Sequence, residues 1–449
     1  MVTQPSSLSP ASSLSPGILH PDTIRSARSS KLGEELGSGI RDVAASRLDL
    51  VRGGLLTMIF ASVFLQRFAL PVGSTAVPLS LFINIAALAW LTLLQQANID
   101  PFRAAFVLLF AAYASICVMF NPSSMLNPSS ETWTSALFAI AIYLPFALVL
   151  RCGDALFMDC LRAFRSMVLI CAGLGILQFA LQSAITSSLL FTFKGYVPES
   201  LLLPEFNTFQ QLTYGSPLYK SNGFFMIEPS TFSQFVAIAI VIELLFYHVK
   251  WRLAVYCAAL LLSYSGTGLI GLALAPAILV SRRSYGTIIV LALFALLALA
   301  TSQLWHMSVT EARTSELSSS GSSGYARFIA PADLIATYQI FRPRDLLFGL
   351  GPGTYLRYGN IMPYEVGEAS WAKVLFEYGV VGSLLFWPLL IVAVFSNAPS
   401  VWLTATLMIG FLTFGGGFLD TRFQALLLVF CVLPKRLASA AVTAAGHRT

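Results

Sequence analysis

The stretch that decides the fold is residues 251–280, which read WRLAVYCAALLLSYSGTGLIGLALAPAILV. These 30 residues would form a helix of about 45 Å, whereas the hydrocarbon core of a bilayer is about 30 Å thick. A single crossing would leave Arg282 and Arg283 outside, but a break at the polar residues 263–268 returns them to the cytoplasm, where Lys and Arg gather. We therefore predict two short spans, and a break that borders a wet cavity because irregular backbone at that depth needs protein or water beside it.

The composition indicates an integral membrane protein. Of the 449 residues, 56 % are hydrophobic and 11 % are charged, against about 25 % charge in soluble domains. The apolar runs continue for about 20 residues, which favours helices over the strands of a barrel. The net charge of +6 falls largely in short loops, so no nucleic-acid partner is expected. The six cysteines lie in or beside apolar runs and are interpreted as buried small side chains.

Together with the remaining apolar runs, the stretch 251–280 predicts an all-α protein of about twelve transmembrane helices. They cover about residues 54–70, 75–94, 104–120, 133–150, 164–181, 229–247, 287–305, 369–395, 401–414 and 417–433. The loop 151–165 carries three arginines, whereas the links before the second and fourth spans carry no Lys or Arg. The bias of cytoplasmic loops toward these residues predicts that both termini are cytoplasmic.

Three regions result from this division. Residues 1–48 are rich in Ser, Pro, Arg and Gly without the apolar core of a cleavable signal peptide, and we expect a disordered cytoplasmic tail. Residues 49–434 form the polytopic membrane domain, and residues 435–449 form a second cytoplasmic tail. Two long polar loops, about 183–222 and 306–367, are predicted to be external. The first is too long for a simple turn and is expected to fold as a cap.

The second external loop carries the main candidate site. Arg327 with Arg342 or Arg344 could clamp a diphosphate, since a guanidinium presents paired donors that match phosphate oxygens. The alternative is that these arginines hold lipid headgroups at the membrane interface. Glu368 precedes the span 369–395, where the helix dipole stabilises a carboxylate, and it is the candidate base for an attacking sugar hydroxyl. The alternative role for Glu368 is an N-terminal capping anion.

Four further residues are candidates for substrate binding. Trp371 could stack on a sugar ring, or belong to the belt of aromatic residues at the membrane interface. Lys220 could reach an anion, and Glu228 stands before Pro229 at a position that suits helix capping. Plain capping with an interfacial lysine is the alternative for this pair. Ser265 lies in the polar break that is expected to border a cavity.

The absence of several sequence motifs argues against two classes of reaction. The sequence contains no Walker loop, no HExxH and no Asp-x-Asp pair, so ATP chemistry and metal-assisted sugar transfer lack the residues that carry them. We expect no cofactor and no metal. Cations on a leaving diphosphate and a carboxylate base on the acceptor fit the sequence better. Lys373 and Glu377 are four residues apart on one helix face and are spaced to pair.

The order of elements from residue 220 to residue 382 resembles the O-antigen polymerase and O-antigen ligase superfamily, which includes the Wzy-type polymerases of exopolysaccharide pathways. The pieces that carry the likeness are Gly223-Phe224-Phe225 with Glu228-Pro229-Ser230, the break at 263–268, Arg327 ahead of the glycine turn 349–353, and Leu375-x-Glu377-x-Gly379. The resemblance implies a GT-C-like fold. It also implies an enzyme that takes a glycan from undecaprenyl diphosphate at the periplasmic face of the bacterial inner membrane, with Arg327 on the diphosphate.

Two departures from the family pattern bear on the reaction. Lys220 stands where an arginine is common, and Glu368 stands where ligases carry a catalytic histidine followed by Asn. We therefore favour a glycosyltransferase that polymerises repeat units, and keep transfer to another acceptor by a ligase as an alternative. A transporter of lipid-linked sugars is a further alternative, although the chain lacks the internal repeat that such transporters often have. The expected partners are the lipid-linked oligosaccharide, membrane lipid and a chain-length regulator, for which no binding motif is visible.

Overall fold

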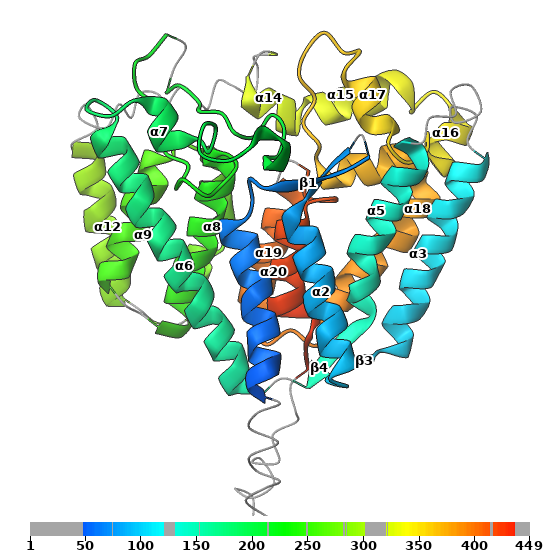
Figure 1. Cartoon of the computed structure of the whole chain (residues 1–449), viewed down its shortest axis with the longest axis horizontal. Helices are drawn as coiled ribbons and strands as arrows, with labels where there is room; N and C mark the ends of the chain where they lie inside the picture. Colours follow the sequence, from blue (N-terminus) through cyan, green and yellow to red (C-terminus); the bar gives the residue numbers. More distant parts are fainter. Residues whose placement is uncertain are drawn as a thin grey trace, which may run out of the picture. The chain divides into compact units, whose positions relative to one another are not determined.

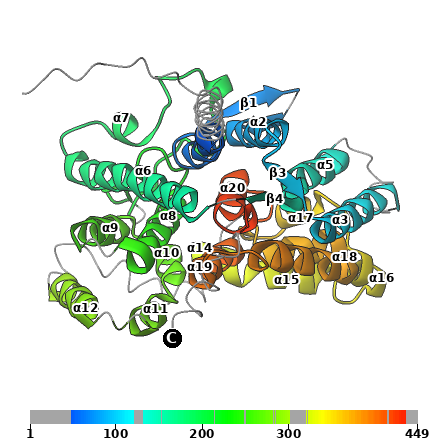
Figure 2. The ribbon, with the colours of Figure 1, turned by 90° about the horizontal axis from the view of Figure 1, so that it is seen from below.

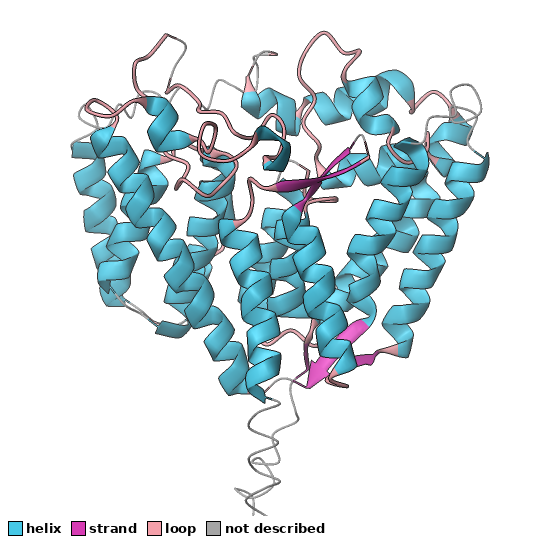
Figure 3. Ribbon diagram, in the orientation of Figure 1, coloured by secondary structure: helices cyan, strands magenta, loops and turns pink. Residues whose placement is uncertain are grey.

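The computed structural model describes residues 48–435, apart from 74, 121–130, 152, 213–214, 248–249, 282, 284, 301–319, 321 and 414–415. The predictions for the two tails therefore lie almost entirely outside the described residues. Contacts divide the chain after Leu50, and the helices and strands named below belong to the unit that begins at Val51. This unit is predominantly helical, as predicted, with five short strands among the described residues (Figures 1 and 3).

Four of the described helices are long and apolar enough to cross a membrane, which indicates a multi-pass membrane protein. They are α3 (Pro101–Phe120), α6 (Asp154–Leu181), α8 (Pro229–Ile242) with the π-helical turn η3 (Glu243–Tyr247), and α18 (Ser370–Phe395). The shorter helices of the predicted spans are α2 (Leu79–Leu93), α5 (Glu131–Tyr143), α9 (Lys250–Leu262), α10 (Gly266–Gly271), α11 (Ala275–Ser281), α12 (Tyr285–Ala300), α19 (Val401–Thr413) and α20 (Thr421–Leu427) with η5 (Leu428–Val432). A further helix ends at residue 64.

The break predicted in residues 251–280 is confirmed. Helix α9 ends at Leu262 and α10 begins at Gly266, with three non-helical residues between them. Helix α10 packs against α8 and α19. A side chain at Gly268 would meet the Ser233 carbonyl oxygen of α8 at 2.6 Å, so the glycine permits this close contact.

The span predicted at 369–395 is not one continuous helix. Gly379 has φ 69° and ψ −169°, which breaks α18 into two parts. Gly349 of the glycine turn packs against Gly379 so closely that neither position has room for a side chain. The carbonyls freed by the break accept from outside the helix: Gln339 donates to Leu375 at 2.8 Å, and the amides of Leu350 and Gly351 donate to Phe376 and Glu377 at 2.9 Å each. The glycine turn thus folds back onto α18.

Several predicted spans have a strand at one end instead of helix. The runs 54–70 and 133–150 end in β1 (Ala69–Val72) and β4 (Leu148–Arg151), and the run 75–94 begins with β2 (Thr75–Pro78). Prolines explain part of the difference, because Pro78 precedes α2 and Pro145 lies in the 3₁₀ turn η1 (Leu144–Ala147), and proline cannot donate within a helix. Strands β1 and β2 pair antiparallel.

A second sheet fixes which helix ends lie on the same side. Strand β4 lies between β3 (Ala97–Ile99), which is antiparallel to it, and β5 (Pro434–Lys435), which is parallel to it. Arg103 donates to the Val432 carbonyl at 2.8 Å and to the Ser396 hydroxyl at 2.6 Å beside this sheet. The predicted topology requires the links after the second and fourth spans to share a side with the chain end after the last span, and the sheet joins all three.

The loop expected to fold as a cap contains α7 (Ser187–Phe191) and the 3₁₀ turn η2 (Glu199–Leu201). The buried Arg67 donates to the carbonyls of Phe191 and Met226, and the Leu203 amide donates to the Arg67 carbonyl. These bonds tie the loop to the segment that leads into α8.

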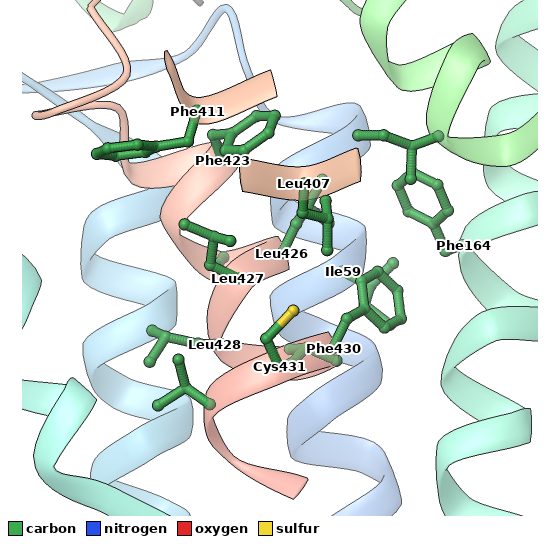
Figure 4. Packing of buried hydrophobic residues seen from close by; sticks show 14 of the residues in the cluster. Ile59, Phe164, Leu407, Phe411, Phe423, Leu426, Leu427, Leu428, Phe430 and Cys431 are labelled. Carbon is green, nitrogen blue, oxygen red and sulfur yellow. The ribbon is translucent and has the colours of Figure 1, made fainter. Parts of the chain in front are cut away.

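The core surrounds α8, α20 and η5. Figure 4 shows buried side chains that pack around α20 and η5: Ile59, Phe164, Leu407, Phe411, Phe423, Leu426, Leu427, Leu428, Phe430 and Cys431. Four of the five described cysteines are buried, which agrees with the prediction that they are small apolar side chains. Cys152 lies outside the described residues.

Candidate functional site

Two of the predicted site residues form an ion pair although they are distant in sequence. Glu228 directly precedes α8 in an extended conformation, and Arg327 lies in the last turn of α14 (Ser323–Phe328). The Arg327 Nη2 atom lies 3.4 Å from Oε2 of Glu228, and both side chains are half-buried. The same Glu228 oxygen accepts a 2.6 Å hydrogen bond from Ser230. Within the described chain, the Glu228 carboxylate does not cap α8, and its side-chain contacts are to Ser230 and Arg327.

Ser265 belongs to a hydroxyl network that reaches the start of α8. Its Oγ lies 2.9 Å from Oγ1 of Thr267, which donates to the Ser230 carbonyl at 3.3 Å. Ser233 donates to that carbonyl at 2.7 Å. The break between α9 and α10 therefore contacts the turn that follows Glu228.

Glu368 is brought to Arg327 through the backbone. The Gly367 amide donates to the Ala326 carbonyl at 2.7 Å, and a side chain at Gly367 would meet that oxygen at 2.8 Å. Tyr355 of α17 (Thr354–Gly359) donates to the Gly367 carbonyl at 2.8 Å. Burial and the nearby carboxylates raise the pKa of Tyr355, so its phenol remains a donor. These bonds hold the residue before Glu368 against the residue before Arg327.

The cation that contacts Glu368 is Lys373, for which the sequence spacing predicts Glu377 as the partner. The Lys373 Nζ atom lies 2.5 Å from Glu368 Oε2 and 3.9 Å from Glu377 Oε1. Lys373 and Glu377 are both buried, whereas Glu368 is half-buried. The Glu377 carboxylate faces the backbone of Gly353 and Tyr355, but neither oxygen has a hydrogen-bond partner among the described residues. The predicted pair is present as the longer of two contacts.

A tyrosine and carboxylate cluster supports the helix that carries Arg327. Tyr325 donates to Asp333 of α15 (Ala330–Tyr338) at 2.6 Å, and Tyr364 donates to the same oxygen at 3.3 Å. The hydrogen bond to Asp333 raises the pKa of Tyr325 above its ordinary value, so the phenol keeps its proton. Ser322 accepts from the Tyr325 amide and caps α14. Arg327 therefore extends from a turn that is fixed on two sides.

Other predicted residues lie apart from this cluster or beside it. Arg342 and Arg344 are exposed at the start of α16 (Pro343–Phe348), and Arg342 lies 3.8 Å from Asp345. Helix α16 packs on α18 and lies away from α14 in both ribbon views (Figures 1 and 2), so the structure does not assemble the predicted arginine clamp. Trp371 is exposed in the first turn of α18. The Lys220 amide donates to Gln210, and the next residue, Ser221, donates to Leu262 at the end of α9.

The sequence signal for the Glu368 and Lys373 contact was weak. Glu368 precedes the helix, so the four-residue spacing rule for helix pairs does not reach it. Among the described residues no group of three or more His, Cys, Asp or Glu side chains could hold a metal ion. The expectation of a metal-independent reaction stays a prediction. Comparisons of the chain with known protein families, curated proteins and solved structures find no match.

Proposed function

We propose that this chain is a glycosyltransferase that polymerises undecaprenyl-diphosphate-linked oligosaccharide repeat units at the periplasmic face of a bacterial inner membrane. One observation carries the proposal: the bond between Gly367 and Ala326 joins the backbone next to the candidate base Glu368 to the backbone next to the candidate phosphate ligand Arg327. The resemblance to the polymerase superfamily supports the same assignment.

The reaction assigns a role to each charged group. A sugar hydroxyl of the acceptor attacks the anomeric carbon of the donor, and the bond from that carbon to the phosphate oxygen breaks. The bonding electrons leave with the lipid diphosphate, whose negative charge Arg327 would stabilise, with Lys220 as a second cation. Glu368 would accept the hydroxyl proton. Glu228 occupies Arg327 at 3.4 Å, so a diphosphate would compete with this carboxylate.

Lys373 and Glu377 fit a supporting role in that reaction. Glu368 can act as a base only as a carboxylate, and the ammonium of Lys373 contacts that group at 2.5 Å. Once Glu368 has taken the proton, the buried Lys373 would lose its nearest counter-charge. Glu377, 3.9 Å from Lys373, remains as the partner that compensates the buried cation.

The fold that accompanies this function is a GT-C-like arrangement of about twelve spans with both termini in the cytoplasm. The sheet of β3, β4 and β5 would then lie at the cytoplasmic side. The pair of Glu228 and Arg327 would lie at the periplasmic side, where the loops 183–222 and 306–367 belong. Labelling of single cysteines from either side of sealed vesicles tests this assignment. Cytoplasmic reaction at residues 322–367 would reject it.

The first experiment is polymer synthesis by the full-length protein in detergent micelles with a lipid-linked repeat unit. Arg327→Ala and Glu368→Ala are each expected to lower the rate at least about 100-fold, while both proteins still reach the membrane. Arg342→Ala is the matched control, because Arg342 is an exposed arginine in the same loop. Normal chain length in the Arg327 and Glu368 variants would reject these roles.

A transporter remains the second candidate because two helical segments are broken, between α9 and α10 and at Gly379. Discontinuous helices often form the substrate sites of transporters. The micelle assay separates the two functions, since micelles have no sealed compartment and polymer made there cannot result from transport. A ligase would give a single addition to a different acceptor instead of a ladder of repeat units.

A further inference from the structure

Residues 341–348, which include α16, expose an unusual mixture of side chains for a loop outside the membrane. Phe341, Leu347 and Phe348 are 87 %, 47 % and 52 % exposed. Arg342 and Arg344 stand beside them and are exposed as well. The Arg342 contact to Asp345 is 3.8 Å long, which is longer than a hydrogen bond. Water-facing loops rarely leave large apolar side chains so open in a cluster.

The contacts of α16 fix its level along a candidate membrane span. The Phe348 carbonyl accepts from the Tyr113 hydroxyl at 3.3 Å and from the Cys117 thiol at 3.7 Å. These residues stand seven and three positions before Phe120, the last residue of the apolar helix α3. At 1.5 Å per residue these positions lie about 5–10 Å inside the end of α3, so the last residue of α16 contacts the last turns of that helix. At this level α3 itself exposes Ile116, Met119 and Phe120.

We propose that residues 341–348 form a membrane-interface anchor that binds the headgroups of anionic phospholipids. Phe341, Leu347 and Phe348 contact the acyl chains next to the exposed apolar side chains of α3. Arg342 and Arg344 bind lipid phosphates, for which the planar guanidinium is well suited. This role explains why these two arginines lie apart from Arg327, and it does not depend on the proposed enzymatic function.

The occupant of this surface is the bilayer because the exposed apolar side chains of α16 continue those of α3, a helix long and apolar enough to span a membrane. The charge agrees, because arginines near a membrane surface attract anionic lipid. A protein partner at the same place would have to displace lipid from the end of α3, and it would shield α16 from water and lipid alike.

The first test measures insertion. A nitroxide is attached to a cysteine introduced at Phe341 or Leu347, in the full-length protein reconstituted in nanodiscs of phosphatidylcholine with phosphatidylglycerol. The control position is Glu365, an exposed residue in the same loop region. We expect the labels at 341 and 347 to collide with oxygen more than with a water-soluble nickel complex, and the label at 365 to show the reverse. Preference for the nickel complex at 341 and 347 would overturn the proposal, and protection from both probes would overturn it in favour of a protein partner.

The second test measures the headgroup. The protein is taken from micelles that contain equal amounts of the two lipids, and the retained phosphatidylglycerol and phosphatidylcholine are compared by native mass spectrometry. The variant Arg342→Gln/Arg344→Gln is expected to lose preference for phosphatidylglycerol by about fivefold per arginine removed. The control Lys194→Gln/Arg357→Gln removes one cation from the loop 183–222 and one from α17, outside residues 341–348. Equal retention by the two double variants would reject binding by Arg342 and Arg344.

Discussion

The starts of α8 and α18 each carry an ion pair, and the two pairs differ in their burial and in the distance along the chain between the partners. Each helix is preceded by a carboxylate that meets a cation, Glu228 with Arg327 and Glu368 with Lys373. The partner of Glu228 comes from 99 residues away and remains half-open to solvent. The partner of Glu368 lies five residues ahead, is buried, and also faces the buried Glu377. We therefore expect the first pair to exchange its partner with a ligand, and the second to stay fixed at the start of α18.

The largest expected effect is on stability. Lys373→Met would leave two carboxylates beside each other without their cation, and removing one partner of a buried ion pair costs about 3–5 kcal/mol. Arg327→Met breaks a partly solvated pair that is worth about 0–1 kcal/mol. We expect the midpoint of thermal unfolding in micelles to fall much further for Lys373→Met than for Arg327→Met.

A double variant tests more strictly how the buried charges around Lys373 contribute to stability. Lys373→Met/Glu377→Gln removes the cation together with the buried carboxylate that has no hydrogen bond among the described residues. It should recover part of the lost stability, because removing both charges avoids an isolated buried ion. If Lys373→Met and Arg327→Met lower the midpoint of thermal unfolding equally, then the two ion pairs do not differ in their contribution to stability as their burial indicates.

The next effect is on the rate of polymer synthesis. Glu377 lies 3.9 Å from Lys373, the cation that contacts Glu368. In Glu377→Gln the buried Lys373 loses the carboxylate that would compensate it once Glu368 has taken a proton. We therefore expect the rate to fall, but by less than the roughly 100-fold loss expected for Glu368→Ala.

The matched control for this loss is Glu365→Gln, which makes the same chemical change at an exposed position. Its rate is expected to be unchanged, because solvent screens the lost charge. An unchanged rate in Glu377→Gln would remove Glu377 from any supporting role beside Glu368.

The sequence predicted the helices of this protein better than its loops. The break before Gly266 was predictable because residues 251–280 exceed the thickness of a bilayer and contain a run of small polar residues. The break at Gly379 was not, because a single glycine in an apolar run is compatible with a helix until Gly349 packs against it. Length constrains a membrane span, whereas a contact between distant glycines leaves no periodic signal.

The residues of the candidate site were likewise predicted only in part. Arg327 and Glu368 were singled out by charge beside apolar runs, and the structure brings their backbones together. Arg342 was grouped with Arg327 because it is near in sequence, yet α15 and the turn after it separate them. The pairing of Glu228 with Arg327 depends on how two loops fold against each other, which local pattern does not determine.

The smallest expected effect tests whether the Glu228 and Arg327 pair exchanges its partner. Glu228→Gln removes the carboxylate that competes with a diphosphate but keeps an acceptor for Ser230. Binding of farnesyl diphosphate, measured calorimetrically in micelles, should become up to about fivefold tighter, which corresponds to the 0–1 kcal/mol of a partly exposed pair. Higher salt should reduce the gain, and Arg327→Ala should weaken binding. Weaker binding by Glu228→Gln would mean that Glu228 positions Arg327 instead of competing for it, and the start of α8 would then be as fixed as the start of α18.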